Sequence, residues 1–206
     1  MIEYKEFAKR WSELHGGAEV EGVVAAWLRI SYAIVRPMAF LRISPNFLTF
    51  LGLASAGVML WAEYLYQILL LLIFSLICDG LDGSLAIYRN RVSPMGNLYD
   101  SIADRLSEGC WLITTNWMGV PPGWALAIWV AASTQEYARA RLASLGYSEI
   151  GVVTPTERPV RAIFVAAVIF LYLYDSPYIT EVAIGFFALQ LISFVMVMKM
   201  ARFIVK

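Results

Sequence analysis

The chain has 206 residues, of which 60% are hydrophobic and 16% are charged. Its mean hydropathy of +0.65 excludes an ordinary soluble globule and indicates one domain of a polytopic membrane protein. Lysine plus arginine number 16, as do aspartate plus glutamate, so the zero net charge offers no electrostatic support for nucleic-acid binding.

The first 43 residues mix basic and apolar side chains. Apolar residues recur every three to four positions across 23–34, which is the spacing of one helix face. This pattern predicts a helix along the membrane surface, interrupted at the glycine pair 16–17 and at Pro37, although a solvent-facing cap is an alternative. We therefore divide the chain into a cytoplasmic amphipathic juxtamembrane segment, 1–43, and a membrane domain, 44–206.

The membrane domain begins at a recognisable helix start. Ser44 is suited to cap the helix and Pro45 to occupy its first turn. The apolar run that leads to Asp79 is too long for one span of about 30 Å and predicts two, turning near 63–67. The second span is predicted at about 68–88, and the later ones at about 94–117, 124–145, 161–174 and 179–198. The expected fold is an all-α integral membrane protein with six transmembrane helices.

The basic residues predict the orientation of these spans. They lie before residue 43, in 89–105, in 139–161 and after 198, whereas the turns near 63–67, 117–123 and 174–181 contain none. With six spans, all of the basic segments fall on one side of the membrane. The positive-inside rule predicts that this side is cytoplasmic, with both termini and the polar site described next facing it. We therefore expect a multi-pass protein of the cell membrane, surrounded by lipid.

Four aspartates lie in the apolar middle of the chain. Asp79 and Asp82 are three residues apart, and Asp100 and Asp104 are four apart, so on two helices each pair occupies one face. An ionised aspartate that faces lipid costs about 3 kcal/mol, so these side chains need a positive partner. Carboxylates without histidine or cysteine among them are hard oxygen ligands, which suit magnesium, manganese or calcium. A cation or proton pathway of a transporter is the alternative interpretation.

Small residues accompany these carboxylates. Gly83 and Ala86 follow Asp79 at the fourth and seventh positions, on the same helix face. They predict a groove with almost no side chain beside the metal site, open to a bulky or phosphorylated ligand.

This constellation resembles the signature of the CDP-alcohol phosphotransferases, D-x2-D-G-x2-A-R-x8-G-x3-D-x3-D. The matching residues are Asp79, Asp82, Gly83, Ala86, Gly96, Asp100 and Asp104. One position departs from the signature, because Ile87 stands where the family has arginine. Arg89 and Arg91 follow within a turn and are candidates to supply that charge. So many spaced polar positions in an apolar chain make a far more specific signal than a lone glycine motif.

The resemblance implies a reaction and a set of roles. Enzymes of this family move a phosphatidyl-type group from a CDP-alcohol to the hydroxyl of a second alcohol and release CMP. The resemblance implies that magnesium or manganese is held by Asp79, Asp82, Asp100 and Asp104, and that Asp104 is also the general base. It further implies a homodimer. An inactive relative that only binds the CDP-lipid, suggested by Ile87, is an alternative.

The same resemblance implies where the CDP-lipid binds. Asp82, Gly83 and Ala86 would contact the CDP group, and the small Gly83 and Ala86 would let the cytidine and diphosphate approach the helix backbone. Asn46 and Thr49, in the first turn of the first span, stand where relatives carry polar residues that contact the nucleotide. Hydrogen bonding at the helix start is an equal alternative for these two side chains.

Basic residues around one predicted cytoplasmic loop point to the acceptor. They are Arg139, Arg141, Arg158 and Arg161. The positive-inside rule accounts for some of them. Their pattern, however, resembles the phosphatidylinositol-phosphate and archaetidylinositol-phosphate synthase branch, in which basic residues here hold the phosphate of inositol phosphate. Arginine suits this role because its planar fork binds phosphate oxygens in pairs. We expect inositol phosphate as acceptor, with Lys199 as a further contact. Glycerol phosphate, free inositol and serine are the alternative acceptors. The lipid of the donor is expected to be built on diacylglycerol or archaeol.

Overall fold

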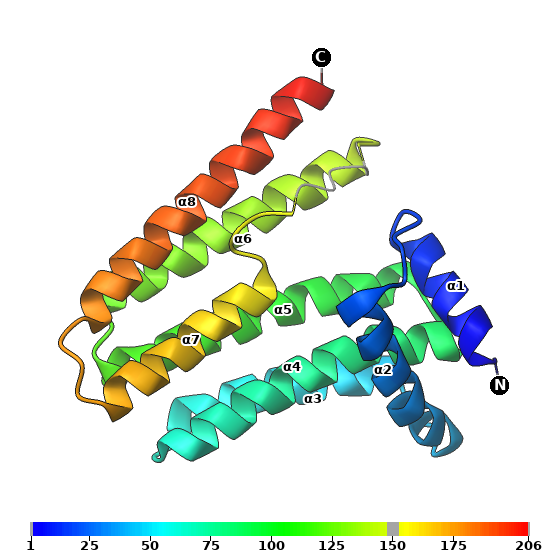
Figure 1. Cartoon of the computed structure of the whole chain (residues 1–206), viewed down its shortest axis with the longest axis horizontal. Coiled ribbons are helices and arrows are strands. Elements are labelled where there is room, and N and C mark those ends of the chain that lie inside the picture. Colours follow the sequence, from blue (N-terminus) through cyan, green and yellow to red (C-terminus); the bar gives the residue numbers. More distant parts are fainter. Residues whose placement is uncertain (1, 148–152, 206) are drawn as a thin grey trace. The chain divides into compact units, whose positions relative to one another are not determined.

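The structure is a computed structural model of the chain and describes residues 2–147 and 153–205. These residues form helices and connecting turns, with no strand among them (Figure 1). The helices are α1 (Tyr4–Leu14), α2 (Gly22–Phe40), α3 (Pro45–Val58), α4 (Leu65–Tyr88), α5 (Pro94–Thr114), α6 (Pro122–Ser144), α7 (Arg158–Leu173) and α8 (Ile179–Ile204), with short 3-10 helices η1 (Met59–Trp61) and η2 (Thr115–Met118). The expected all-α fold is confirmed.

The helices form two compact units. The first contains the chain up to Val58 together with Leu70–Ser107, and the second contains Met59–Leu69 and the chain from Glu108 onward. Helices α4 and α5 contribute to both units. All four motif aspartates belong to the first unit, and the basic residues from Arg139 onward belong to the second.

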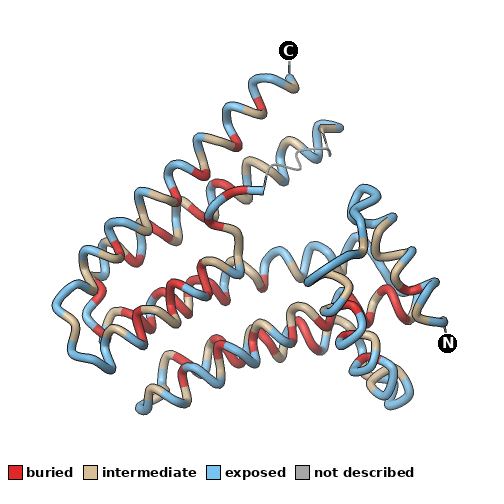
Figure 2. Tube along the Cα trace, in the orientation of Figure 1, coloured by how far each residue is buried: buried red, intermediate tan, exposed pale blue. Residues whose placement is uncertain are grey.

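In the first unit, α1 and α2 pack against the last turns of α4. Their core side chains are Phe7, Leu28, Val35, Leu48, Leu81, Leu85, Ile87 and Tyr88. Figure 2 shows buried positions on these helices alternating with exposed ones. The apolar stripe expected on α2 lies mostly on the other side, because Val23 is 86% and Ile30 is 54% exposed. Trp27 is the exception, since its ring packs against Gly80, where an added Cβ would lie 2.5 Å from the indole.

The expected interruptions of the N-terminal segment have different outcomes. The one at Gly16 and Gly17 is confirmed, because α1 ends at Leu14 and both glycines have positive φ values, 66° and 82°. The one at Pro37 is wrong, because α2 continues through this residue to Phe40. Proline removes one hydrogen bond of the helix. Only three helical residues follow Pro37, so the missing bond affects the end of the helix and not its middle.

Helix α3 starts as the sequence predicts and lies close to α4. The backbone N–H of Phe47 donates to Ser44 Oγ at 3.1 Å, which confirms the N-cap. Gly52 permits the close approach to α4, since an added Cβ would lie 3.1 Å from Cys78 Cβ. Ser55 Oγ also donates to the carbonyl of Leu71 at 2.9 Å. This contact holds the end of α3 against the first turns of α4, and Thr49 near the start of α3 donates to Asp82 of the motif.

In the second unit, α6 and α8 lie side by side (Figure 1). The buried amides of these helices are joined, because Gln190 Nε2 donates to Gln135 Oε1 at 2.9 Å. Helix α7 packs on α8 through the stacked rings of Phe164 and Phe186, whose centroids are 4.4 Å apart. Two buried glutamines and one stacked ring pair therefore link three helices of this unit.

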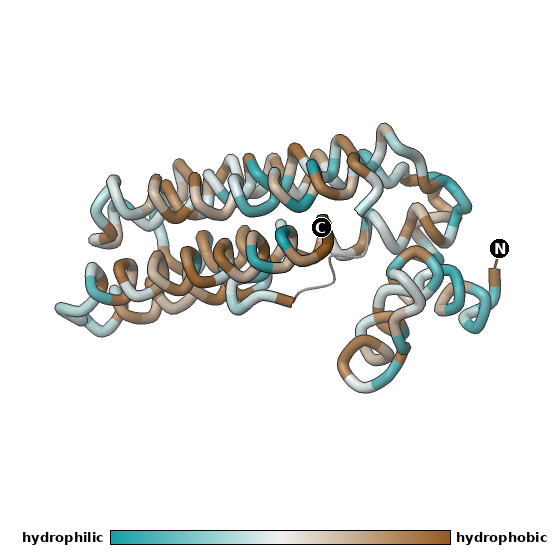
Figure 3. Tube along the Cα trace, turned by 90° about the horizontal axis from the view of Figure 1, so that it is seen from above, coloured by the Kyte–Doolittle hydropathy of each residue, from teal (hydrophilic) through white to brown (hydrophobic). Residues whose placement is uncertain are grey.

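Helices occur at all six positions where spans were predicted. By length and composition, three helices of the described chain are apolar enough to cross a membrane: α2, α4 and α8. Helix α7 is shorter, with 16 residues, and α5 and α6 are less apolar on average than α2, α4 and α8. Hydrophobic positions recur along the helices in Figure 3. Large ones such as Phe170 and Leu173 are about 60% exposed, as lipid-facing side chains are. The protein is an integral membrane protein. Helix α2 was expected to lie along the membrane surface, but it is long and apolar enough to cross the membrane.

Candidate active site

A tight turn between α4 and α5 brings the two halves of the motif together. Helix α4 ends at Tyr88, and the N–H of Arg91 donates to the carbonyl of Ala86 at 2.8 Å. Asn90 has φ 52°, a left-handed conformation that asparagine tolerates better than most residues and that commonly ends a helix. Pro94 then opens α5, as expected from its fixed φ. Helix α5 therefore returns alongside α4.

Three of the four motif aspartates converge. Carboxylate oxygens of Asp79, Asp100 and Asp104 lie within 4.8 Å of one another, and all three residues are half-buried. Oxygen ligands at this spacing fit a hard divalent cation such as magnesium or manganese. The cluster contains one residue of α4 and two of α5, as the helical spacing predicts.

Asp82 lies apart from this cluster. It is 5% exposed, and its Oδ2 accepts a hydrogen bond from Thr49 Oγ1 at 2.5 Å. This bond draws the carboxylate toward α3. Asp82 forms part of the wall of a pocket, and Asp100 of the cluster lines the same pocket.

The pocket is partly open to solvent and belongs wholly to the first unit. Its lining residues are Pro45, Asn46, Thr49, Asp82, Gly83, Ala86, Arg91, Val92, Ser93, Gly96, Asn97 and Asp100. The lining therefore includes all five residues expected to contact the CDP-lipid, which are Asn46, Thr49, Asp82, Gly83 and Ala86. At Gly83 an added Cβ would meet nothing within 4 Å, so this position opens onto the pocket as the groove prediction requires.

Ile87 stands where the family motif has arginine, and it belongs to the core of the first unit. Ile87 is 5% exposed and packs with Phe7 and Leu28. Of the two candidate replacements, Arg89 turns away, because its Nη1 donates to the carbonyl of Ile43 at 2.6 Å. Arg91 lines the pocket. The structure thus distinguishes two arginines that the sequence could not.

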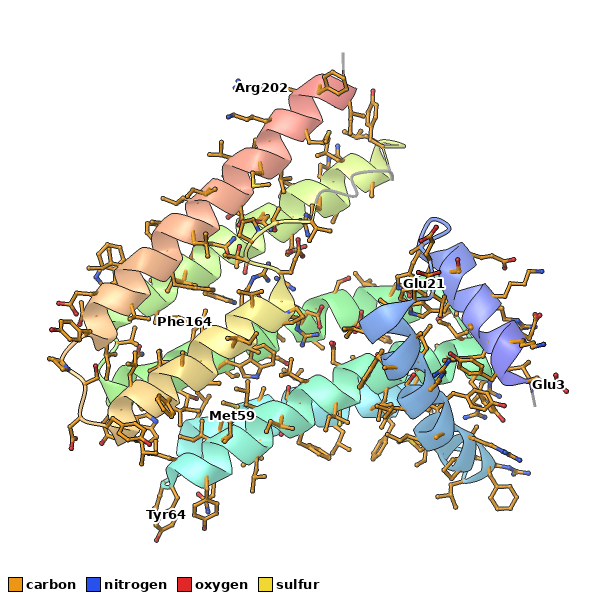
Figure 4. All side chains as sticks on the ribbon, in the orientation of Figure 1. Glu3, Glu21, Met59, Tyr64, Phe164 and Arg202 are labelled. Atoms are coloured by element: carbon orange, nitrogen blue, oxygen red, sulfur yellow. The ribbon has the colours of Figure 1, made fainter. Side chains whose placement is uncertain are left out.

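In the second unit the arginines lie among glutamates. Arg161 is 1% exposed, and its guanidinium donates to Glu108 Oε1 and Glu136 Oε1, each at 2.7 Å. Its Nε donates to the carbonyl of Thr156 at 2.9 Å. Arg158 stacks over the ring of Trp111, 5.3 Å from the centroid. In Figure 4, nitrogen and oxygen atoms gather where the chain before α7 passes α6.

Arg139 joins α6 to the residues that precede α7. Its two terminal nitrogens donate to the two carboxylate oxygens of Glu157 at 3.0 and 2.8 Å. Glu157 Oε1 also accepts from the N–H and the hydroxyl of Thr154, both at 2.8 Å. Burial raises the pKa of Glu157, but the hydrogen bonds from Arg139 and Thr154 outweigh it and bring that pKa to about 2. Of the remaining predicted contacts, Arg141 and Lys199 are exposed.

Comparison with known proteins decides the family. Residues 42–205 match the family model described as CDP-alcohol phosphatidyltransferase. The chain belongs to this family. It is 31% identical over 164 residues to the archaetidylinositol phosphate synthase of Aeropyrum pernix, and the match covers 77% of each chain.

Solved structures of one bacterial protein share the fold of this phosphatidyltransferase. The phosphatidylinositol phosphate synthase PgsA1 of Mycobacterium tuberculosis, in complex with manganese and citrate, has a TM-score of 0.62 at 21% identity over 81% of this chain and 84% of that one. The same protein with CDP-DAG bound has a TM-score of 0.60 at 22% identity, over 82% and 89% of the two chains. The recognition of the family from its spaced motif is confirmed.

This phosphatidyltransferase is an enzyme that depends on a divalent metal, and its own residues fit that requirement. The expected magnesium or manganese matches the oxygen-only cluster of Asp79, Asp100 and Asp104. Some residues were missed from the sequence. Val92, Ser93 and Asn97 line the pocket, and the signal for them was their place between the two halves of the motif.

The acidic partners of the arginines were also missed. Glu108 is fully buried and Glu136 half-buried, although each has polar neighbours in sequence, such as Ser107 and Gln135. A lone buried carboxylate is costly and needs a cationic partner, but the sequence around these two glutamates gives no local sign that they are buried. The arginine that each one meets lies elsewhere in the sequence.

Proposed function

We propose that this phosphatidyltransferase moves a phosphatidyl-type group, built on diacylglycerol or archaeol, from a CDP-linked lipid to inositol phosphate in phospholipid biosynthesis. The observation that carries the proposal is the convergence of Asp79, Asp100 and Asp104 beside a pocket whose wall includes Asp100. The choice of acceptor is supported by the archaetidylinositol phosphate synthase that is 31% identical to this chain over 164 residues.

The pocket suits the CDP part of the donor. Gly83 and Ala86 leave the helix backbone accessible, so a flat base and a diphosphate can lie against it. Asn46 and Thr49 offer polar groups from α3. Arg91 brings a positive charge to the same wall, opposite in sign to the diphosphate.

The aspartates hold the metal and move the proton. Asp79, Asp82, Asp100 and Asp104 are the proposed ligands. The chemistry that a bound magnesium or manganese ion supplies is neutralisation of charge on the diphosphate and on departing CMP. Asp104 is the proposed base, because an ionised carboxylate can take the proton of the acceptor hydroxyl as that oxygen attacks phosphorus.

Basic residues of the second unit are the proposed contacts of the acceptor phosphate. They are Arg139, Arg141, Arg158, Arg161 and Lys199. Arg141 and Lys199 are exposed and can reach a soluble ligand directly. Arg161 is buried with Glu108 and Glu136, so we assign it an indirect part, in which it holds the surrounding groups in place.

The membrane arrangement belongs to the same proposal. The segment 1–43 is a cytoplasmic juxtamembrane element, and 44–206 is a domain of six spans with both termini and the site facing the cytoplasm. The positions of the basic residues support this orientation. The outward-facing Val23, Ile30 and Ile34 support contact of α2 with lipid. We also propose a homodimer, in keeping with the exposed apolar faces of the helices.

A CMP-release assay tests the function. Purified protein is given CDP-diacylglycerol or CDP-archaeol with magnesium or manganese, and each is offered inositol phosphate, glycerol phosphate, inositol or serine. We expect release with inositol phosphate and none after chelation of the metal. Preference for another acceptor would overturn the acceptor assignment, and absence of release with all four would overturn the proposed reaction. Arg141→Ala should raise the KM for the phosphorylated acceptor and leave that for the CDP-lipid unchanged.

A further inference from the structure

The N-terminal helix α1 is anchored to the end of α4, although it lies outside the residues that match the family model. Phe7 is fully buried, and its ring lies 5.5 Å from that of Tyr32 on α2. Tyr32 in turn contacts the ring of Tyr88, the last residue of α4, at 5.6 Å. Its hydroxyl also donates to the carbonyl of Ile2 at 3.0 Å. Helix α1 is therefore packed in one position against the turn that follows α4.

A polar contact extends this packing into the turn itself. Arg10 Nη1 donates to Asn90 Oδ1 at 3.2 Å, across 80 positions of sequence. Arg10 Nε is at the same time held by Glu6 Oε1 at 2.8 Å, one helical turn earlier. The Glu6 carboxylate orients the guanidinium, so that one of its terminal nitrogens is directed at the turn.

Asn90 is the residue at which the chain changes direction. Its left-handed backbone, with φ 52°, ends α4 and sends the chain toward α5. The next three residues, Arg91, Val92 and Ser93, line the pocket. A hydrogen bond to the side chain of Asn90 therefore acts on the segment that places Arg91.

We propose that α1 is a positioning element for the donor pocket, in which Arg10, through Asn90, holds the turn that places Arg91 against the diphosphate of the CDP-lipid. This inference rests on the proposed function, because it assumes that the pocket binds the donor. Arg10 itself lies outside the residues that line the pocket, so it is a positioning residue.

The test compares Arg10→Ala, Asn90→Gly and the double variant. Glycine adopts the left-handed conformation without steric cost, so Asn90→Gly removes the hydrogen-bond acceptor and keeps the turn. Lys9→Ala is the matched control, because Lys9 is a neighbouring cation on α1 whose side chain is 70% exposed and pairs with Glu13. CMP release is measured against CDP-lipid concentration and, separately, against acceptor concentration, with magnesium present.

We expect each single variant to raise the KM for the CDP-lipid about threefold to tenfold, as loss of one hydrogen bond to a charged group does. The kcat and the KM for the acceptor should stay unchanged, and the double variant should match the singles because both remove the same contact. Lys9→Ala should resemble the wild type.

Three results would overturn the inference. They are equal behaviour of Arg10→Ala and Lys9→Ala, multiplication of the two single effects in the double variant, and a parallel fall of kcat and thermal stability in place of a KM effect. Equilibrium binding of CDP-diacylglycerol to the magnesium-loaded protein separates this inference from the proposed function. Wild-type protein that binds the lipid without turnover would overturn the function, while weaker binding by Arg10→Ala would still support the positioning role. Wild-type protein that does not bind the lipid would overturn both.

Discussion

Replacing Arg161 by alanine removes the central cation of the second unit. Its guanidinium is 1% exposed and donates to Glu108, which is fully buried, and to Glu136. Alanine leaves the Glu108 carboxylate in the protein interior without its 2.7 Å partner, and Arg158 Nε lies farther away, at 3.9 Å. Removal of one partner from a buried ion pair costs about 3 to 5 kcal/mol. For a chain of 206 residues that corresponds to a fall in Tm of roughly 6 to 20 °C.

The two free cysteines provide an assay for this loss. Cys78 is buried and Cys110 half-buried, so a thiol-reactive fluorophore reports unfolding of the purified protein in detergent. Arg141→Ala is the matched control for stability, because it removes an exposed arginine from the same region and should change Tm by no more than a degree or two. Arg161→Gln combined with Glu108→Gln should be less damaging than Arg161→Ala, since the pair is neutralised together. A Tm for Arg161→Ala equal to that of Arg141→Ala would refute the reasoning.

Three further predictions follow from the site and its supports. Asp104→Asn should lower kcat by about 100-fold or more while the protein still binds CDP-lipid, because an amide cannot take the acceptor proton. Intact turnover in this variant would show that another group is the base. Gly80→Ala should destabilise the fold by about 1 to 3 kcal/mol, because its Cβ would lie 2.5 Å from the Trp27 ring. Gly83→Ala should keep Tm or raise it slightly, since a Cβ there meets nothing within 4 Å and alanine favours a helix more than glycine does. Equal Tm values for the two variants would contradict this packing. The pKa of Glu157 is lowered from 4.5 to about 2, so its contribution to stability is complete above pH 4.5 and is lost as the pH falls through 2. Between these pH values the Tm of Glu157→Gln should therefore fall less steeply than that of the wild type. Parallel Tm curves for the two proteins would argue against the ion pair.

The sequence by itself determined the local features and the chemistry of the site. Ser44 caps α3 because a hydroxyl before a helix satisfies its free N–H groups, and this depends only on neighbouring residues. The spacing of Asp79, Asp100 and Asp104 along two helices likewise predicted that their carboxylates meet, because helical periodicity sets which side chains share a face.

Only the tertiary structure decided which faces pack and which charges pair. On α2, Leu28 is buried and Ile30 exposed, and hydrophobicity does not separate them because lipid and protein core are both apolar. Arg161 and Glu108 are 53 residues apart, and nothing local selects one glutamate for one arginine. The sequence also could not predict the environment of Ile87. The family motif has arginine at this position, but here the side chain packs against α1 and α2. Contacts between distant segments depend on how whole helices dock, and that information resides in their combined surfaces.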